Sequence, residues 1–244
     1  MVTSAADGGA SPAVLLENLV FRRPGRSRPV LDIPAFAARR GEQVFIAGPS
    51  GSGKSTLLGL VSGILVPSEG SVSVNGTRLN DLGGAQRDAF RGDHIGIVFQ
   101  QFNLIPYLSV LENVLIPCRF SLLRRARAAA QAGSPRQAAR TLLERLDMPP
   151  ALWDRKARLL SVGQQQRTAA ARALIGSPSV LIADEPTSSL DADRRAGFLR
   201  LLLGECAASG ATLLFVSHDP ALADVFPAAL FLPELNRAPG EDAA

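Results

Sequence analysis

A glycine- and serine-rich stretch around position 50 has the residue types and the spacing that bind phosphate. It matches the pattern G-x-x-x-x-G-K-[ST], and it lies between an apolar run at 43–47, predicted to be a strand, and a helical apolar pattern that begins at Leu57. Glycines let backbone amides turn toward an anion, and the following helix directs its positive end at the same point. Lys54 can reach the β- and γ-phosphate oxygens of a nucleotide, and Ser55 can offer its hydroxyl to Mg²⁺. The predicted phosphate-binding residues are Gly48, Pro49, Ser50, Gly51, Ser52, Gly53, Lys54, Ser55 and Thr56.

Two adjacent carboxylates follow another apolar run, at 180–183. In an enzyme with a phosphate-binding loop, the first carboxylate after such a strand supports Mg²⁺, a role that falls to Asp184. The second, Glu185, can orient and deprotonate the water that attacks the terminal phosphate. An apolar run that ends in Asp-Glu is common by itself, so this prediction depends on the phosphate-binding loop.

These motifs are set among alternating predicted strands and helices. Strands are predicted at 14–21, 43–47, 95–99, 180–183, 212–216 and 230–232, with a hairpin turn at Asn75-Gly76. Between about 104 and 159 the pattern is helical, with Ser109 and Ser134-Pro135 as predicted helix starts, and a further helix is predicted over 194–208. Such an order favours an α/β fold with a largely parallel sheet covered by helices.

The composition excludes several classes of protein. Of 244 residues, 46% are apolar and 20% are charged, which is too apolar for a mainly disordered chain. No run of 18 apolar residues is present, and the two cysteines, Cys118 and Cys206, form no disulfide framework. The positive charge is almost all arginine, since Lys54 and Lys156 are the two lysines, and a net charge of +4 is a weak signal for nucleic acid. We therefore expect no nucleic-acid partner.

A stretch from Leu160 to Arg167 resembles the signature of ATP-binding cassette (ABC) ATPases, which normally contains LSGGQ. Its signature residues are Ser161, Val162, Gly163 and Gln164. Other motifs follow the family's order. Gln100 corresponds to the Q-loop glutamine, and the stretch from Ser188 to Asp191 corresponds to the D-loop with Asp191 as its aspartate. His218 corresponds to the switch histidine, and Phe21 to the aromatic residue that stacks on adenine.

The resemblance covers about residues 14–234, which we expect to form one ABC ATPase domain between a flexible N-terminal tail at 1–13 and a C-terminal tail at 235–244. It implies a P-loop NTPase core with a mostly parallel sheet, an N-terminal antiparallel β subdomain and an inserted helical subdomain. It also implies ATP and Mg²⁺ as ligands, with Ser55, Gln100 and Asp184 near the metal. Glu185, His218 and Gln100 are the implied catalytic residues.

Members of this family work as head-to-tail pairs, so the resemblance implies a second ABC ATPase subunit, either identical or a close relative. Each ATP would lie between the phosphate-binding loop of one subunit and the signature of the other. Ser161 and the amide of Gly163 would face the γ-phosphate across that interface. Asp191 would couple the two sites.

One residue departs from the family pattern: Val162 replaces the first glycine of the LSGGQ pair. A β-branched residue would be badly strained at positive φ, whereas it costs little in a helical backbone. Because Ser161, Gly163 and Gln164 are intact, we expect a helical backbone at Val162 and an active site.

The segment from Phe99 to Val114 resembles the ATPases of the lipoprotein-release, macrolide-export and FtsE-type group. That implies a separate transmembrane permease with a large extracytoplasmic domain, docked on the loop after Gln100, and a cytoplasmic location at the inner face of the membrane. Two alternatives remain open at this point. One is a nucleic-acid-linked ABC ATPase, although Gln100 and Ser161 are too close for a long coiled-coil insert. The other is a regulatory subunit that binds ATP but hydrolyses it weakly.

Overall fold

The computed structural model describes residues 11–188 and 190–238. The chain divides into two units, here called the loop unit (Met1–Arg91 and Thr212–Ala244) and the helical unit (Gly92–Ala211). The tails predicted at 1–13 and 235–244 fall mostly outside the described residues. Where they are described, the Ala13 amide donates to Ala38 O at 2.8 Å, and the Asn236 side chain bonds Asp32 and Val30 of the loop unit.

The loop unit contains an antiparallel sheet in the order β2-β1-β4-β5. Its strands are β1 (Val14–Arg22), β2 (Pro29–Ala38), β4 (Glu69–Val74) and β5 (Thr77–Arg78). The hairpin turn predicted at Asn75-Gly76 is confirmed, because Val74 pairs with Thr77 and both turn residues have positive φ, 51° and 81°. Positive φ at both central residues is what a tight hairpin turn of this twist requires.

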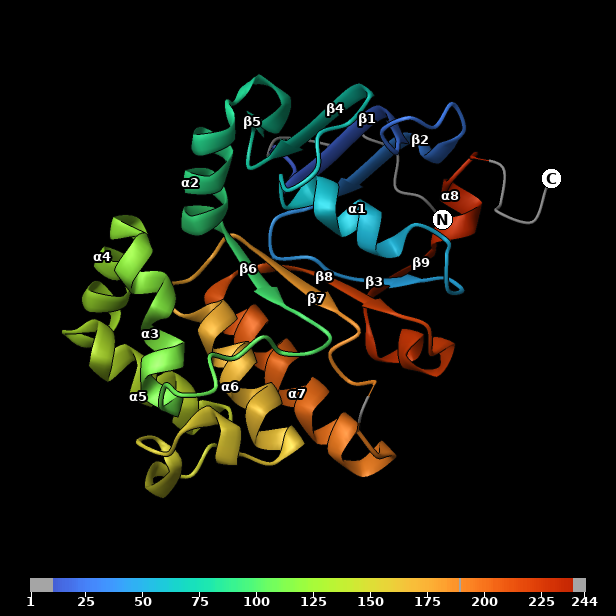
Figure 1. Cartoon of the computed structure of the whole chain (residues 1–244). Coiled ribbons are helices and arrows are strands. Elements are labelled where there is room, and N and C mark those ends of the chain that lie inside the picture. Colours follow the sequence, from blue (N-terminus) through green and yellow to red (C-terminus); the bar gives the residue numbers. More distant parts are fainter. Residues whose placement is uncertain (1–10, 189, 239–244) are drawn as a thin grey trace. The chain divides into compact units, whose positions relative to one another are not determined.

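The same unit contains three parallel strands in which β3 (Gln43–Ala47) lies between β8 (Thr212–Ser217) and β9 (Ala228–Phe231). Helix α1 (Lys54–Val61) follows β3 and packs against β4 and β2 (Figure 1). The rings of Phe45, Phe215 and Phe226 contact one another with centroids 5.0–6.1 Å apart and fill the core beside these strands. The remaining elements are the short helices η1 (Leu79–Asp81), η4 (Pro220–Val225) and α8 (Leu232–Leu235), and α2 (Gly84–His94), which runs into the helical unit.

The helical unit is built on a parallel strand pair, β6 (Ile95–Val98) and β7 (Val180–Asp184). Helix α6 (Val162–Leu174) packs on β6 so closely that a Cβ at Gly96 would lie 2.2 Å from Ala173 O. Helices α3 (Val110–Phe120), α4 (Leu122–Ala132) and α5 (Pro135–Arg145) form a cluster in which α3 and α5 contact α6 (Figure 1). The short helices η2 (Pro150–Leu152) and η3 (Ala157–Leu159) lead into α6, and α7 (Ala192–Ser209) follows β7.

Both helix starts predicted in the 104–159 segment are confirmed. Ser109 caps α3 by a reciprocal capping box with Glu112, and Ser134 caps α5, whose first residue is Pro135. The bonds from Ser109 hold the pKa of the Glu112 carboxyl below its usual range, because they favour the charged form. The α/β architecture with an antiparallel N-terminal sheet, a parallel strand arrangement and added helices is also confirmed.

Three elements differ from the sequence prediction. Strand β2 had no prediction, because Pro34 and Asp32 interrupt its apolar pattern; the strand tolerates Pro34 since β2 is the edge of its sheet. Helix α2 also had no prediction. It buries no residue, so its sequence has no apolar stripe that would indicate a helix. The predicted strand 230–232 is β9 at Ala228–Phe231, and Leu232 instead begins α8. Within residues 11–188 and 190–238, no helix combines the length and the apolar character needed to span a membrane.

Candidate functional site

The predicted phosphate-binding loop connects β3 to α1 and opens the first turn of that helix. Gly53 precedes the helix with φ 97°, a left-handed conformation suited to glycine, and among the described residues no side chain caps this end. The Lys54 side chain is buried, and its Nζ donates to Gly48 O at 2.7 Å and to Pro49 O at 2.8 Å. The ammonium therefore lies inside the turn, beside the uncapped amides of α1.

One polar atom of this loop supports an anion site. The Ser52 hydroxyl oxygen is buried and has no hydrogen-bond partner among the described residues. A buried hydroxyl without a partner is costly unless a ligand satisfies it. The Ser52 hydroxyl, the Lys54 ammonium and the uncapped start of α1 together suit the phosphates of a nucleotide.

The structure buries Phe21, the residue predicted to stack on adenine. Its side chain is 8% exposed near the end of β1 and is paired across the sheet with Leu31. Leu31 in turn lies against the phosphate-binding loop, since a Cβ at Gly53 would be 2.7 Å from Leu31 Cδ2. The burial favours a packing role behind the loop, and adenine stacking by Phe21 stays a prediction.

His218 lies at the same edge of the parallel strands as the phosphate-binding loop. Ala47, the last residue of β3, pairs with Ser217, the last residue of β8. Gly48 and His218 are the next residues of the two strands, so both follow the carboxyl ends of neighbouring strands, where α/β proteins place their ligands. His218 is exposed there.

In the helical unit, the predicted carboxylates and the Q-loop glutamine share a second strand edge. Val98 pairs with Ala183, so Gln100 follows the end of β6, and Asp184 and Glu185 lie at the end of β7. Glu185 has φ 46°, an uncommon conformation for a non-glycine residue and one found often at functional sites. This unit therefore brings Gln100, Asp184 and Glu185 together.

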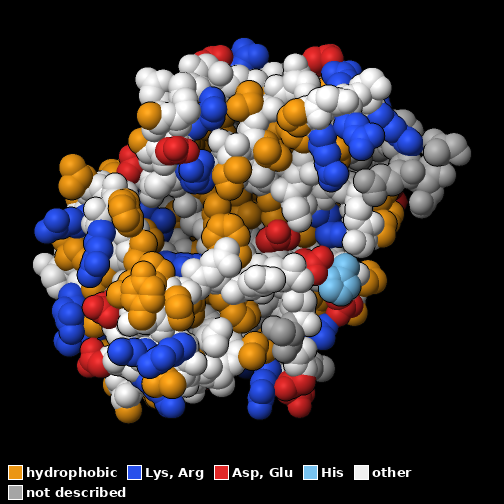
Figure 2. Space-filling model, in the orientation of Figure 1, with side chains coloured by type: hydrophobic (Ala, Val, Ile, Leu, Met, Phe, Trp, Pro, Cys, Tyr) orange, Lys and Arg blue, Asp and Glu red, His pale blue; other side chains and the backbone are white. Residues whose placement is uncertain are grey.

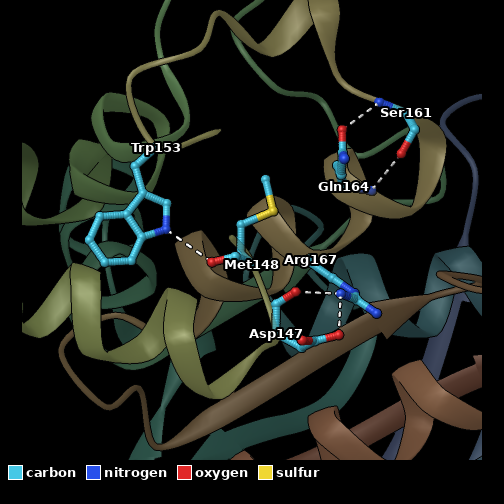
Figure 3. A network of polar contacts seen from close by, with 6 residues as sticks. All are labelled: Asp147, Met148, Trp153, Ser161, Gln164 and Arg167. Atoms are coloured by element: carbon cyan, nitrogen blue, oxygen red, sulfur yellow. Dashed lines mark hydrogen bonds and ion pairs between the residues drawn. The ribbon is translucent and has the colours of Figure 1, made fainter. Parts of the chain in front are cut away.

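The predicted signature residues form the exposed start of α6. The Ser161 side chain accepts from Gln164 N at 3.4 Å, and Gln164 Oε1 accepts from Ser161 N at 3.0 Å, a reciprocal capping box (Figure 3). Val162 is the first residue of the helix and is 46% exposed. The expected helical backbone at Val162 is confirmed, because positive φ is absent there.

Polar contacts also surround α6 on both sides of its length. Arg167 donates to the backbone and the carboxylate of Asp147, and Trp153 Nε1 donates to Met148 O at 3.1 Å in the same network (Figure 3). At the other end of α6, the buried Arg124 of α4 donates to the carbonyls of Ala173 and Ile175. Burial lowers the pKa of the Arg124 guanidinium to about 10, and its position at a helix C-terminus is the favourable one for a cation.

Sequence reasoning missed Asn113, which fixes the segment that follows Gln100. Its side chain is fully buried, accepts from Ile105 N at 2.8 Å and donates to Ile105 O at 3.1 Å. A polar residue in the apolar stripe of a predicted helix was the available signal. Asp191, the predicted D-loop residue, caps α7 by accepting from Arg194 N at 2.9 Å. Ser189 lies outside the described residues.

One face of the molecule carries side chains of both charges. On the face drawn in Figure 2, acidic side chains lie among the basic ones. This arrangement agrees with the modest net charge of +4.

Comparison with known proteins identifies the family. The model described as ABC transporter matches residues 31–188. An uncharacterized ABC transporter ATP-binding protein of Mycobacterium tuberculosis is 43% identical over 216 residues, which cover 86% of this chain and 83% of that protein. The lipoprotein-releasing system ATP-binding protein LolD of Chromohalobacter salexigens is 39% identical over 204 residues, with coverage of 84% and 83%.

A solved structure agrees with these relatives. It is the dimeric ATP-binding cassette MJ0796 in a post-hydrolysis state with ADP and Pi, which matches with TM-score 0.78 at 34% identity over 93% of this chain and 96% of that one. The Methanocaldococcus jannaschii protein of that name is an uncharacterized ABC transporter ATP-binding protein. The chain therefore belongs to the ABC transporter family, as an ATP-binding and ATP-hydrolysing subunit.

Proposed function

We propose that this subunit powers a separate membrane permease by closing on ATP with a second cassette, head to tail. The carrying observation is that the molecule has two helix starts suited to phosphate. The start of α1 encloses a buried Lys54, whereas the start of α6 presents Ser161 and Val162 to solvent. An exposed start of this kind is available to the nucleotide of another subunit, and the related MJ0796 cassette is described as a dimer with ADP and Pi.

The residues of the loop unit would bind the triphosphate. Lys54 would exchange its bonds to Gly48 O and Pro49 O for β- and γ-phosphate oxygens, while the amides of the loop and of α1 donate to the same anion. His218 follows β8 at the same strand edge and would contact the γ-phosphate. ATP would thereby join the two subunits, and hydrolysis would release them.

The helical unit would supply the group that activates water. Glu185 would orient and deprotonate the attacking water, with Gln100 beside it at the end of β6. Asp184, Ser55 and Gln100 offer the hard oxygen ligands that Mg²⁺ prefers. The described residues form no group of three or more His, Cys, Asp or Glu that could hold a metal ion. Mg²⁺ would neutralise charge on the β- and γ-phosphates.

The permease would dock on the loop that follows Gln100. Tyr107 in this loop is 70% exposed and Leu159 is 53% exposed. Backbone bonds join the loop to the segment around Leu159, since Ala157 N donates to Leu108 O and Arg158 N to Pro106 O. An exposed apolar surface on a well-anchored loop suits a cytoplasmic helix of a membrane partner. The likeness to LolD supports a permease of the lipoprotein-release, macrolide-export and FtsE-type group.

Glu185→Gln tests this function. The variant should bind ATP with unchanged affinity, hydrolyse it about 100-fold or more slowly because the general base is lost, and accumulate as an ATP-bound dimer. Turnover is measured by phosphate release and dimer formation by light scattering after size exclusion, with ATP and Mg²⁺ and with ADP as the control. A Glu185→Gln protein that stays monomeric with ATP, alone and in the presence of the permease, would contradict the head-to-tail model.

A further inference from the structure

Helix α6 makes a two-point contact with the backbone just after Gln100. Arg172 donates from Nη2 to Phe102 O and from Nη1 to Asn103 O, both at 2.6 Å. In the part of the chain that the structure describes, no carboxylate forms an ion pair with this guanidinium. The planar fork of arginine fixes two acceptors at once, which a single-point donor such as lysine does not do.

The two carbonyls belong to an unusual piece of backbone. Phe102 and Asn103 both have positive φ, 60° and 48°. The turn is closed by Phe102 N donating to Phe99 O at 2.9 Å and by Asn103 N donating to Gln101 O at 2.6 Å, so Gln100 lies inside it. Backbone in sparsely populated conformations persists when its surroundings hold it there. Arg172 supplies such a restraint.

The same helix holds the backbone next to Glu185. Gln166 is 1% exposed, and its Nε2 donates to Pro186 O at 2.7 Å. Pro186 directly follows Glu185, which itself has positive φ. One helix therefore carries the signature at its start and bonds the segments beside both Gln100 and Glu185.

We propose that Arg172 and Gln166 are positioning residues through which helix α6 sets the orientation of Gln100 and Glu185. This inference rests on the proposed function, because it assigns those two residues to the nucleotide. A displacement of α6, whether started by a nucleotide at Ser161 or by a permease on the loop after Gln100, moves the backbone that carries the hydrolytic groups. Helix α6 thereby links the binding of nucleotide at the subunit interface to the hydrolysis of nucleotide, through contacts that all lie within the helical unit.

The test compares two arginines of the same helix. Arg172→Met removes the contact with the Q-loop backbone, whereas Arg167→Met removes a contact of α6 with Asp147 and serves as the matched control. We expect Arg172→Met to lower kcat about 10- to 100-fold, since small misplacement of reacting groups has effects of that size. The KM for ATP should change less than about twofold, because Arg172 restrains the backbone beside Gln100 and contacts neither Lys54 nor Ser161. Arg167→Met should keep the turnover of the unmodified protein.

Three further measurements separate positioning from general loss of structure. Arg172→Lys should recover part of the lost kcat, because one donor remains. In a Gln100→Ala background, with enough protein for residual turnover to be measurable, Arg172→Met should lower kcat less than about twofold further, since residues that act through one another are not additive. Gln166→Met should lower kcat with little change in KM.

Three outcomes would overturn the proposal: unchanged kcat in Arg172→Met, an equal loss in Arg167→Met, or a full independent loss in the Gln100→Ala background. Dimer formation by Glu185→Gln is measured separately. Failure of that dimer rejects the proposed function, whereas a normal dimer together with any of the three outcomes rejects only the role of Arg172 and Gln166.

Discussion

The two helix starts proposed to bind phosphate, those of α1 and α6, are built in opposite ways. Helix α1 is preceded by a left-handed glycine, Gly53, which gives no side-chain cap, and its first residue is the buried Lys54. Helix α6 is preceded by Ser161, whose side chain caps it, and its first residue is the exposed Val162. An uncapped, enclosed helix start suits a ligand bound within one subunit. A helix start that is capped by its own serine is stable in the free subunit, and because it is exposed it remains accessible to a second subunit.

The capping box at α6 also leaves the Ser161 hydroxyl able to donate a hydrogen bond. Its hydroxyl oxygen accepts from Gln164 N through a lone pair, so the hydroxyl hydrogen can donate to a phosphate oxygen at the same time. One residue can thus stabilise the free helix and recognise the partner's nucleotide. Lys54, in contrast, donates to two carbonyl oxygens of its own loop, Gly48 O and Pro49 O.

The largest expected effect is at α1. Lys54→Ala should lower ATP turnover by about 100-fold or more, because it removes the charge that stabilises the terminal phosphates. Turnover and the affinity for a fluorescent ATP analogue are measured together. The control is Lys156→Ala, because Lys156 is the other lysine of the chain and is exposed. Equal turnover in Lys54→Ala and in the unmodified protein would refute the role given to the loop.

A smaller effect is expected at α6, where two cap residues can be compared. Ser161→Ala and Ser134→Ala each remove an N-cap and should each lower the free energy of unfolding by about 1 kcal/mol. Only Ser161→Ala should also lower turnover, by about tenfold, because a hydrogen bond to a charged phosphate is lost. Denaturant unfolding and phosphate release check the two parts. A similar loss of turnover in both variants would mean that the Ser161 effect is only structural.

The smallest effect is expected at the residue that departs from the family pattern. Val162→Gly restores the usual glycine, yet turnover should change less than about twofold, because the backbone is already helical there. Stability should fall by a few tenths of a kcal/mol, about the difference in helix propensity. A rise in turnover of about tenfold would instead mean that Val162 weakens the site and would favour a regulatory subunit.

The same contrast explains what the sequence could predict. The phosphate-binding loop is one continuous stretch whose strand, glycines and helix are all adjacent, so its conformation follows from local residue types. The hairpin at Asn75-Gly76 and the caps at Ser109 and Ser134 were predictable for the same reason. The backbone of α6 at Val162 was also foreseen, since the intact neighbours left a helix as the unstrained choice.

Contacts between distant segments could not be predicted in this way. Arg172 is 70 residues from Phe102 along the chain, and Gln166 is 20 residues from Pro186. An arginine in an alanine-rich helix has the same local signal whether it faces solvent or a buried carbonyl. Strand β2 was hidden by Pro34, whose position at a sheet edge is a property of the whole sheet.

The bonds from Lys54 Nζ to Gly48 O and Pro49 O have a thermodynamic consequence for nucleotide capture. They tie the loop to its own lysine, so the cradle keeps its shape without outside help. Little chain entropy is then lost when a triphosphate enters, while Lys54 exchanges these two bonds for bonds to phosphate oxygens. ATP should therefore bind the phosphate-binding loop without a large rearrangement of its backbone. The association rate is then set by diffusion and charge.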